Sequence, residues 1–115
     1  MKNKIFVACD TSKVKTAKKI INLTKTKKIK IGYKFGLEFL NSKNGRFFVS
    51  KIKNKIIFAD LKLNDIPNTC TSTVKALKDL NINYLTIHIS SGLEALKAVK
   101  KISGKTKIVG VTTLT

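Results

Sequence analysis

Three charged side chains in one short segment have the types and spacing for proton-transfer chemistry. Asp60 and Lys62 follow the apolar run 56–59 and stand two residues apart, so on a strand they project from the same face. Asp65 comes three residues later, where Pro67 and neighbouring asparagines indicate that the strand has passed into a loop. The spacing therefore predicts a lysine ammonium held between two carboxylates at the end of a buried strand.

This charged cluster has two interpretations. Buried charges are unfavourable unless they are paired, so one interpretation is a purely structural ion-pair network. The other is a functional site, because flanking carboxylates keep an ammonium charged and a fixed ammonium can deliver a proton to a reacting atom. The spacing leaves both open, and the neighbouring elements have to decide between them.

Apolar runs and helical periodicity alternate along the whole chain. We expect strands at 5–9, 29–33, 56–59, 84–87 and 107–111. We expect helices at about 13–23, from about 37, from 68 or 69 to about 80, and from about 92 to 102. Thr11 or Ser12 should cap the first helix, and Asn68 or Thr69 the one that follows the third strand. Repeated strand–helix units predict parallel strands joined by right-handed crossovers.

A polar residue stands at the end of each expected strand, at a nearly constant spacing. These residues are Asp10, Lys34, Asp60, His88 and Thr113. The carboxyl ends of parallel strands meet at one edge, where such folds bind their ligands. Each residue alone has a structural explanation, as a helix cap, a solvated lysine or a hydrogen-bonded histidine, and for His88 we favour that explanation. Together they predict one rim of functional side chains.

The net charge of +18 invites a nucleic-acid interpretation, but the residue types argue against it. Arg46 is the only arginine, whereas bidentate contacts to phosphate and guanine favour arginine, and aromatic residues for base stacking are few. The positive charge would still attract small phosphorylated ligands. We therefore expect no nucleic-acid partner.

The length and the cysteines indicate a single domain, 1–115, in a reducing compartment. A hydrophobic content of 43% is enough for a core. No apolar run approaches the roughly 18 residues that cross a bilayer, and the N-terminus lacks a signal-peptide pattern. Cys9 and Cys70 have no metal-binding spacing and suggest reduced thiols. We expect a cytoplasmic protein without membrane contact.

The segment that runs from Asp60 to Thr69 resembles the signature of the orotidine 5'-phosphate decarboxylase family. The pattern is Asp60-x-Lys62-x-x-Asp65-Ile66-Pro67-Asn68-Thr69. Three further segments resemble the family's first, second and fifth strands, namely 8–10, 34–38 and 111–115. The resemblance implies an α/β fold, the (β/α)8 TIM barrel, here incomplete, of which this chain would supply the first five βα units as an N-terminal portion. In the family the residues that grip the substrate phosphate come from the last strands.

The resemblance also implies a reaction: decarboxylation of orotidine 5'-phosphate to UMP in de novo pyrimidine biosynthesis, with neither metal nor other cofactor. Lys62 would donate the proton to C6, and Lys34, Asp60 and Asp65 would complete an alternating charged array. Asp60 would face the substrate carboxylate. The implied substrate-binding residues are Asp10, Lys34, Asp60, Lys62, Asp65, Ile66, Thr69 and Thr115.

The family signature further implies a homodimer, because the residues that match Asp65, Ile66 and Thr69 reach into the partner's site. Asp10 and Lys34 would hold the ribose hydroxyls. Thr115 would lie near the base of the nucleotide.

Three alternatives remain beside this interpretation. One is a Mg-dependent relative in the same superfamily, a ketogulonate-phosphate decarboxylase or hexulose-phosphate synthase, although these place a glutamate where Lys34 stands. Another is a basic nucleic-acid-binding module. The last is an inactive fragment that only oligomerises, since five units would leave strands one and five with unpaired edges. In that fragment, an apolar interior built from Val7, Ile31, Phe58, Ile87 and Val109 would be partly open to water.

Overall fold

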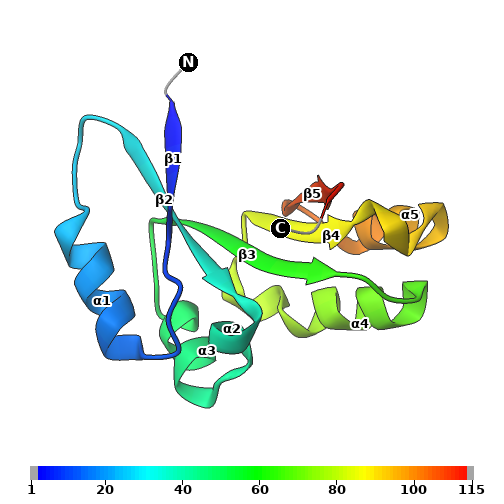
Figure 1. The fold of residues 1–115 in the computed structure, drawn as a ribbon, viewed down its shortest axis with the longest axis horizontal. Helices are drawn as coiled ribbons and strands as arrows, with labels where there is room; N and C mark the ends of the chain where they lie inside the picture. The colour runs from blue at the N-terminus through cyan, green and yellow to red at the C-terminus, as the bar shows by residue number, and fades with distance from the viewer. Residues whose placement is uncertain (1–2, 114–115) are drawn as a thin grey trace.

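Five parallel strands form one twisted sheet in which every strand pairs with its neighbours in the chain (Figure 1). The computed structural model describes residues 3–113. The strands are β1 (Lys4–Ala8), β2 (Lys30–Gly36), β3 (Ile56–Leu63), β4 (Tyr84–His88) and β5 (Lys107–Val111). The order β1-β2-β3-β4-β5 is the order expected for successive units of a (β/α)8 barrel.

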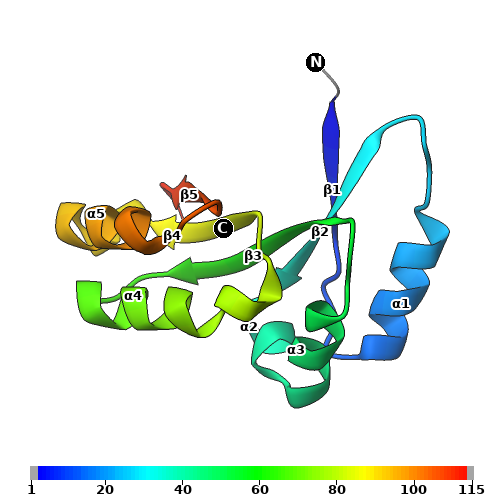
Figure 2. The same ribbon diagram turned by 180° about the vertical axis from the view of Figure 1, so that it is seen from behind.

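A helical connection follows each of the first four strands (Figures 1 and 2). The α-helices are α1 (Val14–Leu23), α2 (Leu37–Asn41), α3 (Lys43–Ser50), α4 (Pro67–Ala76) and α5 (Leu93–Ile102). Two short 3₁₀ turns are η1 (Lys78–Leu80) and η2 (Ile89–Ser91). Because parallel strands need a crossover to return to the same end of the sheet, this alternation places all five carboxyl ends along one edge.

The hydrophobic core lies between one face of the sheet and the helices. Alternate strand residues such as Tyr33, Phe35 and Ile57 are buried there. They pack with helix residues that recur at helical spacing, for example Val99 of α5, which is fully buried. The helical face of the sheet therefore carries the apolar packing, and the opposite face is left for other side chains.

That opposite face is curved and carries an aromatic cluster of Phe6, Phe58 and Tyr84. Ring centroids of these three side chains lie 5.3–5.8 Å apart. Lys4 on β1 donates a hydrogen bond to the Tyr84 hydroxyl on β4 at 3.0 Å, although two strands separate them in the sheet. Gly32 leaves room for the Phe6 ring in this cluster, since a Cβ at position 32 would stand 2.6 Å from that ring. The sheet curls as a barrel wall does.

Several expected boundaries are corrected by the structure. β2 continues to Gly36 and β3 to Leu63, beyond the expected ends at 33 and 59, because parallel pairing persists up to Gly36 with Asp60. The first helix has Lys13 at its N-cap, and the Thr11 hydroxyl instead accepts a hydrogen bond from the Lys13 N–H. α4 begins at Pro67, which suits the first helical turn because it has no N–H to satisfy, so neither Asn68 nor Thr69 is its cap.

The expected apolar interior is also corrected. Ile87 is fully buried and Val7 and Ile31 pack against the same core, so all three lie on the helical side of the sheet. Phe58 and Val109 lie on the opposite, curved face. The reason is the two-residue alternation along each strand, which the earlier grouping of these five residues did not respect.

Candidate active site

The carboxyl ends of β1, β2 and β3 surround a pocket of about 410 Å³. Its lining includes three of the residues that the sequence predicted to share one rim, Asp10, Lys34 and Asp60, together with Lys62 of the predicted charged cluster. Lys34 and Asp60 face this pocket from neighbouring strands, while the exposed Asp10 lies just beyond β1. The strand-end argument therefore placed three of its five residues together correctly, whereas His88 and Thr113 do not line this pocket.

The Asp60 carboxylate is the centre of the charged cluster. Lys62 Nζ lies 2.7 Å from its Oδ2 atom, and Lys34 Nζ lies 3.3 Å from the same oxygen. The Asp60 side chain is 11% exposed and each lysine side chain 38%. Both cations stabilise this largely buried carboxylate as an anion.

Thr86 on β4 contacts both members of the closest ion pair, and the sequence interpretation missed it. Its hydroxyl donates to Asp60 Oδ1 at 2.8 Å and accepts from the backbone N–H of Lys62 at 2.9 Å. A threonine inside an apolar strand is an ordinary strand residue by type. The available signal was its position, two residues before the strand-end residue His88 and hence on the same face.

Burial and hydrogen bonding act on Asp60 in opposite directions. Desolvation acts to raise its pKa, but the hydrogen bonds from Lys62 and Thr86, the charge of Lys62 and the hydrogen bond from Lys34 together lower the pKa below its usual value of 3.8. The Lys34–Asp60–Lys62 cluster therefore holds one ionised carboxylate between two cations. Cys9 also lines the pocket, but burial raises the pKa of its thiol to about 11, so it stays protonated at neutral pH.

The expected array of alternating charges is present in part. Lys34, Asp60 and Lys62 follow one another as expected, but no ion pair joins Lys62 to Asp65 within residues 3–113 of this chain. Because β3 runs on to Leu63, Asp65 lies beyond it in the turn before α4, where its carboxylate accepts a hydrogen bond from the Ile66 N–H at 2.7 Å.

The remaining predicted residues lie outside this pocket. Ile66 is 64% exposed and Thr69 is exposed, both near the start of α4. His88 is buried at the end of β4, on the same face as Thr86, and is not among the residues that line the pocket. Thr115 falls outside the described residues.

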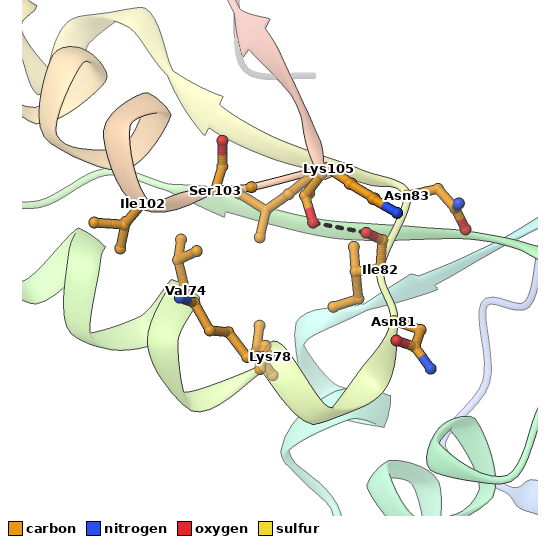
Figure 3. Close-up of a pocket in the computed structure, with 12 residues that line it drawn as sticks. Val74, Lys78, Asn81, Ile82, Asn83, Ile102, Ser103 and Lys105 are labelled. Atoms are coloured by element: carbon orange, nitrogen blue, oxygen red, sulfur yellow. Dashed lines mark hydrogen bonds between the residues drawn. The ribbon is translucent and has the colours of Figure 1, made fainter.

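A second pocket, of about 390 Å³, opens at the amino ends of β4 and β5 (Figure 3). The labelled side chains around it include Val74, Asn81 and Lys105. It has no carboxylate or imidazole in its lining, and the Thr106 hydroxyl is engaged with the Ile82 carbonyl at 2.7 Å. This pocket lacks the carboxylate–ammonium cluster of the strand-end pocket, and that cluster makes the strand-end pocket the candidate active site.

Two features are absent from residues 3–113. No three histidine, cysteine, aspartate or glutamate side chains are grouped so that they could hold a metal ion. No helix among these residues is long and apolar enough to cross a membrane.

The sequence has extensive similarity to known proteins. A family model described as "Orotidine 5'-phosphate decarboxylase / HUMPS family" matches residues 3–115. The orotidine 5'-phosphate decarboxylase of Wolbachia sp. subsp. Brugia malayi is 47% identical over 98% of this chain, and that of Fusobacterium nucleatum is 39% identical over 100%. The match covers 51% and 50% of those two proteins, so this chain spans about half the length of the curated relatives it matches.

Solved structures agree with the sequence matches. Orotidine 5'-phosphate decarboxylase from Lactobacillus acidophilus superposes with a TM-score of 0.82 at 31% identity, over 97% of this chain and 54% of that one. The orotidine 5'-monophosphate decarboxylase of Methanocaldococcus jannaschii, complexed with inhibitor BMP, also gives 0.82, at 27% identity, over 97% of this chain and 53% of that one.

Proposed function

Because the chain belongs to the orotidine 5'-phosphate decarboxylase / HUMPS family, we propose that the protein converts orotidine 5'-phosphate to UMP and CO2 in de novo pyrimidine biosynthesis. The observation that carries the proposal is the Lys34–Asp60–Lys62 cluster in the pocket at the strand ends. The (β/α)8 fold expected from the sequence is confirmed for the strands that this chain contains, by their order and by the likeness to the Lactobacillus enzyme.

The proposed reaction breaks one C–C bond and forms one C–H bond. As CO2 leaves, the bonding electron pair stays on C6 of the pyrimidine, and that carbon takes a proton from Lys62 Nζ. Asp60 supports this role by holding the ammonium in place before the reaction, so little reorganisation is needed when charge develops. The substrate carboxylate would face Asp60, and this repulsion would be relieved as CO2 departs.

The other charged residues of the pocket are assigned to substrate binding. Asp10 and Lys34, which line the pocket from the ends of the first two strands, would bind the ribose hydroxyls. Thr115 would lie near the pyrimidine.

We propose a reaction that needs no metal ion. Support comes from Asp60 Oδ2, since both lysines already contact this oxygen and would repel a cation there. The Mg-dependent alternative of the same superfamily needs that region of the pocket for metal ligands. There the Lys34 ammonium would repel a metal ion.

The proposed active form is a homodimer in the cytoplasm. Asp65, Ile66 and Thr69 are exposed near the start of α4 and do not line the pocket of their own chain, so they are free to reach a partner's site. Cys9 and Cys70 are both free thiols, as in a reducing compartment.

The test is an assay of CO2 release from carboxyl-labelled orotidine 5'-phosphate, with and without chelator. Since this chain spans half of its relatives, the assay uses a completed protein, in which Thr115 is followed by the remaining part of the Wolbachia relative. We expect turnover that chelator does not change. Turnover that chelator abolishes and Mg2+ restores would favour the metal-dependent alternative, and no turnover at all would favour an inactive oligomerising chain.

A further inference from the structure

The strand β3 bulges where it carries Asp60 and Lys62. In the ladder with β4, Ala59 pairs with Leu85 and Leu63 pairs with Ile87, with a register shift between the two pairs. Three residues of β3 therefore stand opposite the single residue Thr86. Such a bulge breaks the regular ladder and re-aims the side chains that it carries.

Lys62, within this bulge, has an unusual backbone conformation. Its φ angle is +48°, in the left-handed region that lysine rarely adopts. A residue is kept in that region only when its surroundings hold it there. The Lys62 N–H donates its hydrogen bond to the Thr86 side chain, at 2.9 Å, so a hydroxyl fills the place of a backbone acceptor.

The Thr86 hydroxyl has one proton and two lone pairs, and its two contacts use them in a defined way. The proton goes to Asp60 Oδ1 at 2.8 Å, and a lone pair accepts the Lys62 N–H. Asp60 is left with Oδ2 for the Lys62 ammonium at 2.7 Å. With Thr86 only 5% exposed, water cannot easily replace the hydroxyl in either contact.

We propose that Thr86 is the positioning residue of the active site: its hydroxyl bridges the bulge and sets both the plane of the Asp60 carboxylate and the backbone of Lys62, and hence the place of the Lys62 ammonium. The catalytic consequence rests on the proposed function, whereas the structural part does not. Thr86 does not touch the reacting atoms. It acts through the two residues that do.

Ser91, in the turn η2 that follows β4, provides a matched control. Its hydroxyl lies 3.3 Å from the Leu63 carbonyl and 3.3 Å from the Asn64 side chain, so it ties the end of β3 without touching the charged cluster. Thr86→Val removes the hydroxyl and keeps the shape, Thr86→Ser restores the hydroxyl, and Ser91→Ala tests general loosening of the strand end.

The experiment measures three quantities in the completed protein: kcat for decarboxylation, the pKa of Asp60 by carboxyl 13C NMR, and amide exchange of Lys62. For Thr86→Val we expect kcat to fall by about 10²-fold, as for a small misplacement of reacting groups, with UMP affinity changed by less than about threefold. The Asp60 pKa should rise and the Lys62 amide should exchange faster. Thr86→Ser should restore all three, and Ser91→Ala should leave them unchanged.

The proposal is overturned if Thr86→Val keeps the original kcat, Asp60 pKa and Lys62 exchange, or if Ser91→Ala reproduces its effects. If Thr86→Val does not fold, Thr86→Cys replaces it, since a thiol is a weak hydrogen-bonding group of similar size. If the unchanged protein lacks decarboxylase activity, the proposed function fails, while the pKa and exchange measurements still decide the role of Thr86.

Discussion

Lys62 Nζ lies 2.7 Å from Oδ2 of Asp60, the same oxygen that a second ammonium also contacts. One carboxylate thus contacts two cations in the lining of the strand-end pocket, and the Lys34–Asp60–Lys62 cluster has a net positive charge. An anionic nucleotide would be attracted to it, and a proton-bearing nitrogen would already be fixed near the reacting carbon.

The stability of this cluster should depend on pH in a definite direction. Because the pKa of Asp60 is lowered in the folded protein, the cluster stabilises the fold above the unfolded-state pKa, near 3.8. This contribution is lost as the pH falls through the lower folded-state value. Asp60→Asn should therefore reduce the free energy of unfolding at pH 7 by about 1.5–3 kcal/mol, and the difference should shrink toward zero in strong acid.

Denaturant unfolding of the completed protein between pH 7 and pH 2 measures this dependence. Asp79→Asn is the matched control, since Asp79 pairs with Arg46 but is 62% exposed, and its loss should change stability by about 1 kcal/mol or less. An Asp60→Asn difference that stays constant over the whole pH range would contradict the assignment of an ionised, paired carboxylate.

The curvature of the sheet can be tested separately, at the amino ends of the strands. The hydrogen bond from Lys4 lowers the pKa of Tyr84, desolvation acts against it, and the charges of Lys4, Lys107 and Lys30 add to the lowering. Lys4→Met should raise that pKa toward 10.0, and Lys53→Met should not change it. NMR titration of the Tyr84 ring carbon measures the shift. An unchanged pKa in Lys4→Met would mean that β1 does not curl over β4.

The strand ends could be predicted from sequence because they depend on local pattern. Each apolar run stops at a polar residue, and the ends of parallel strands share one edge, so Asp10, Lys34 and Asp60 were expected together and are found together. The same rule predicted ends of β2 and β3 that lie several residues before the observed ones. A charged side chain on the curved face can lie within a strand, as Lys34 and Asp60 do.

The partners of these charges could not be predicted, because they depend on pairing between strands. The separation in sequence suggested that Lys62 contacts both neighbouring aspartates, but the bulge opposite Thr86 and the continuation of β3 leave Asp65 in the next turn. Nothing in the local sequence reveals a two-residue register shift. Thr86 was missed for the same reason, because its contacts with Asp60 and Lys62 depend on the bulge in the neighbouring strand β3.

The proposed homodimer predicts complementation between two inactive variants. Lys62→Ala and Asp65→Asn, each in the completed protein, should have little activity alone and regain part of it when mixed. Subunit exchange would create one site with an intact Lys62 and an intact Asp65 from the partner. The measurement is turnover of the mixture, with exchange verified by mass spectrometry. If exchanged mixtures remain inactive, Asp65 does not act across the interface.

The 115-residue chain by itself should associate or unfold readily. Within residues 3–113, β1 pairs only with β2 and β5 only with β4, so each has an edge of unpaired backbone groups. The net charge of +18 opposes association, and salt should weaken that repulsion. Sedimentation at low and high salt should show oligomers that grow with salt, without decarboxylase activity. A cooperative, monomeric and active chain would contradict this prediction.

The central claim is that Lys62 supplies the proton, and a single substitution tests it most directly. In the completed protein, Lys62→Ala should lower the rate of CO2 release by at least about 10²–10⁴-fold, the usual contribution of a general acid, while UMP affinity stays within about 10²-fold. Lys97→Ala removes an exposed lysine of α5 and should keep the original rate. A Lys62→Ala protein that turns over at a rate near that of the Lys97→Ala control would contradict the claim.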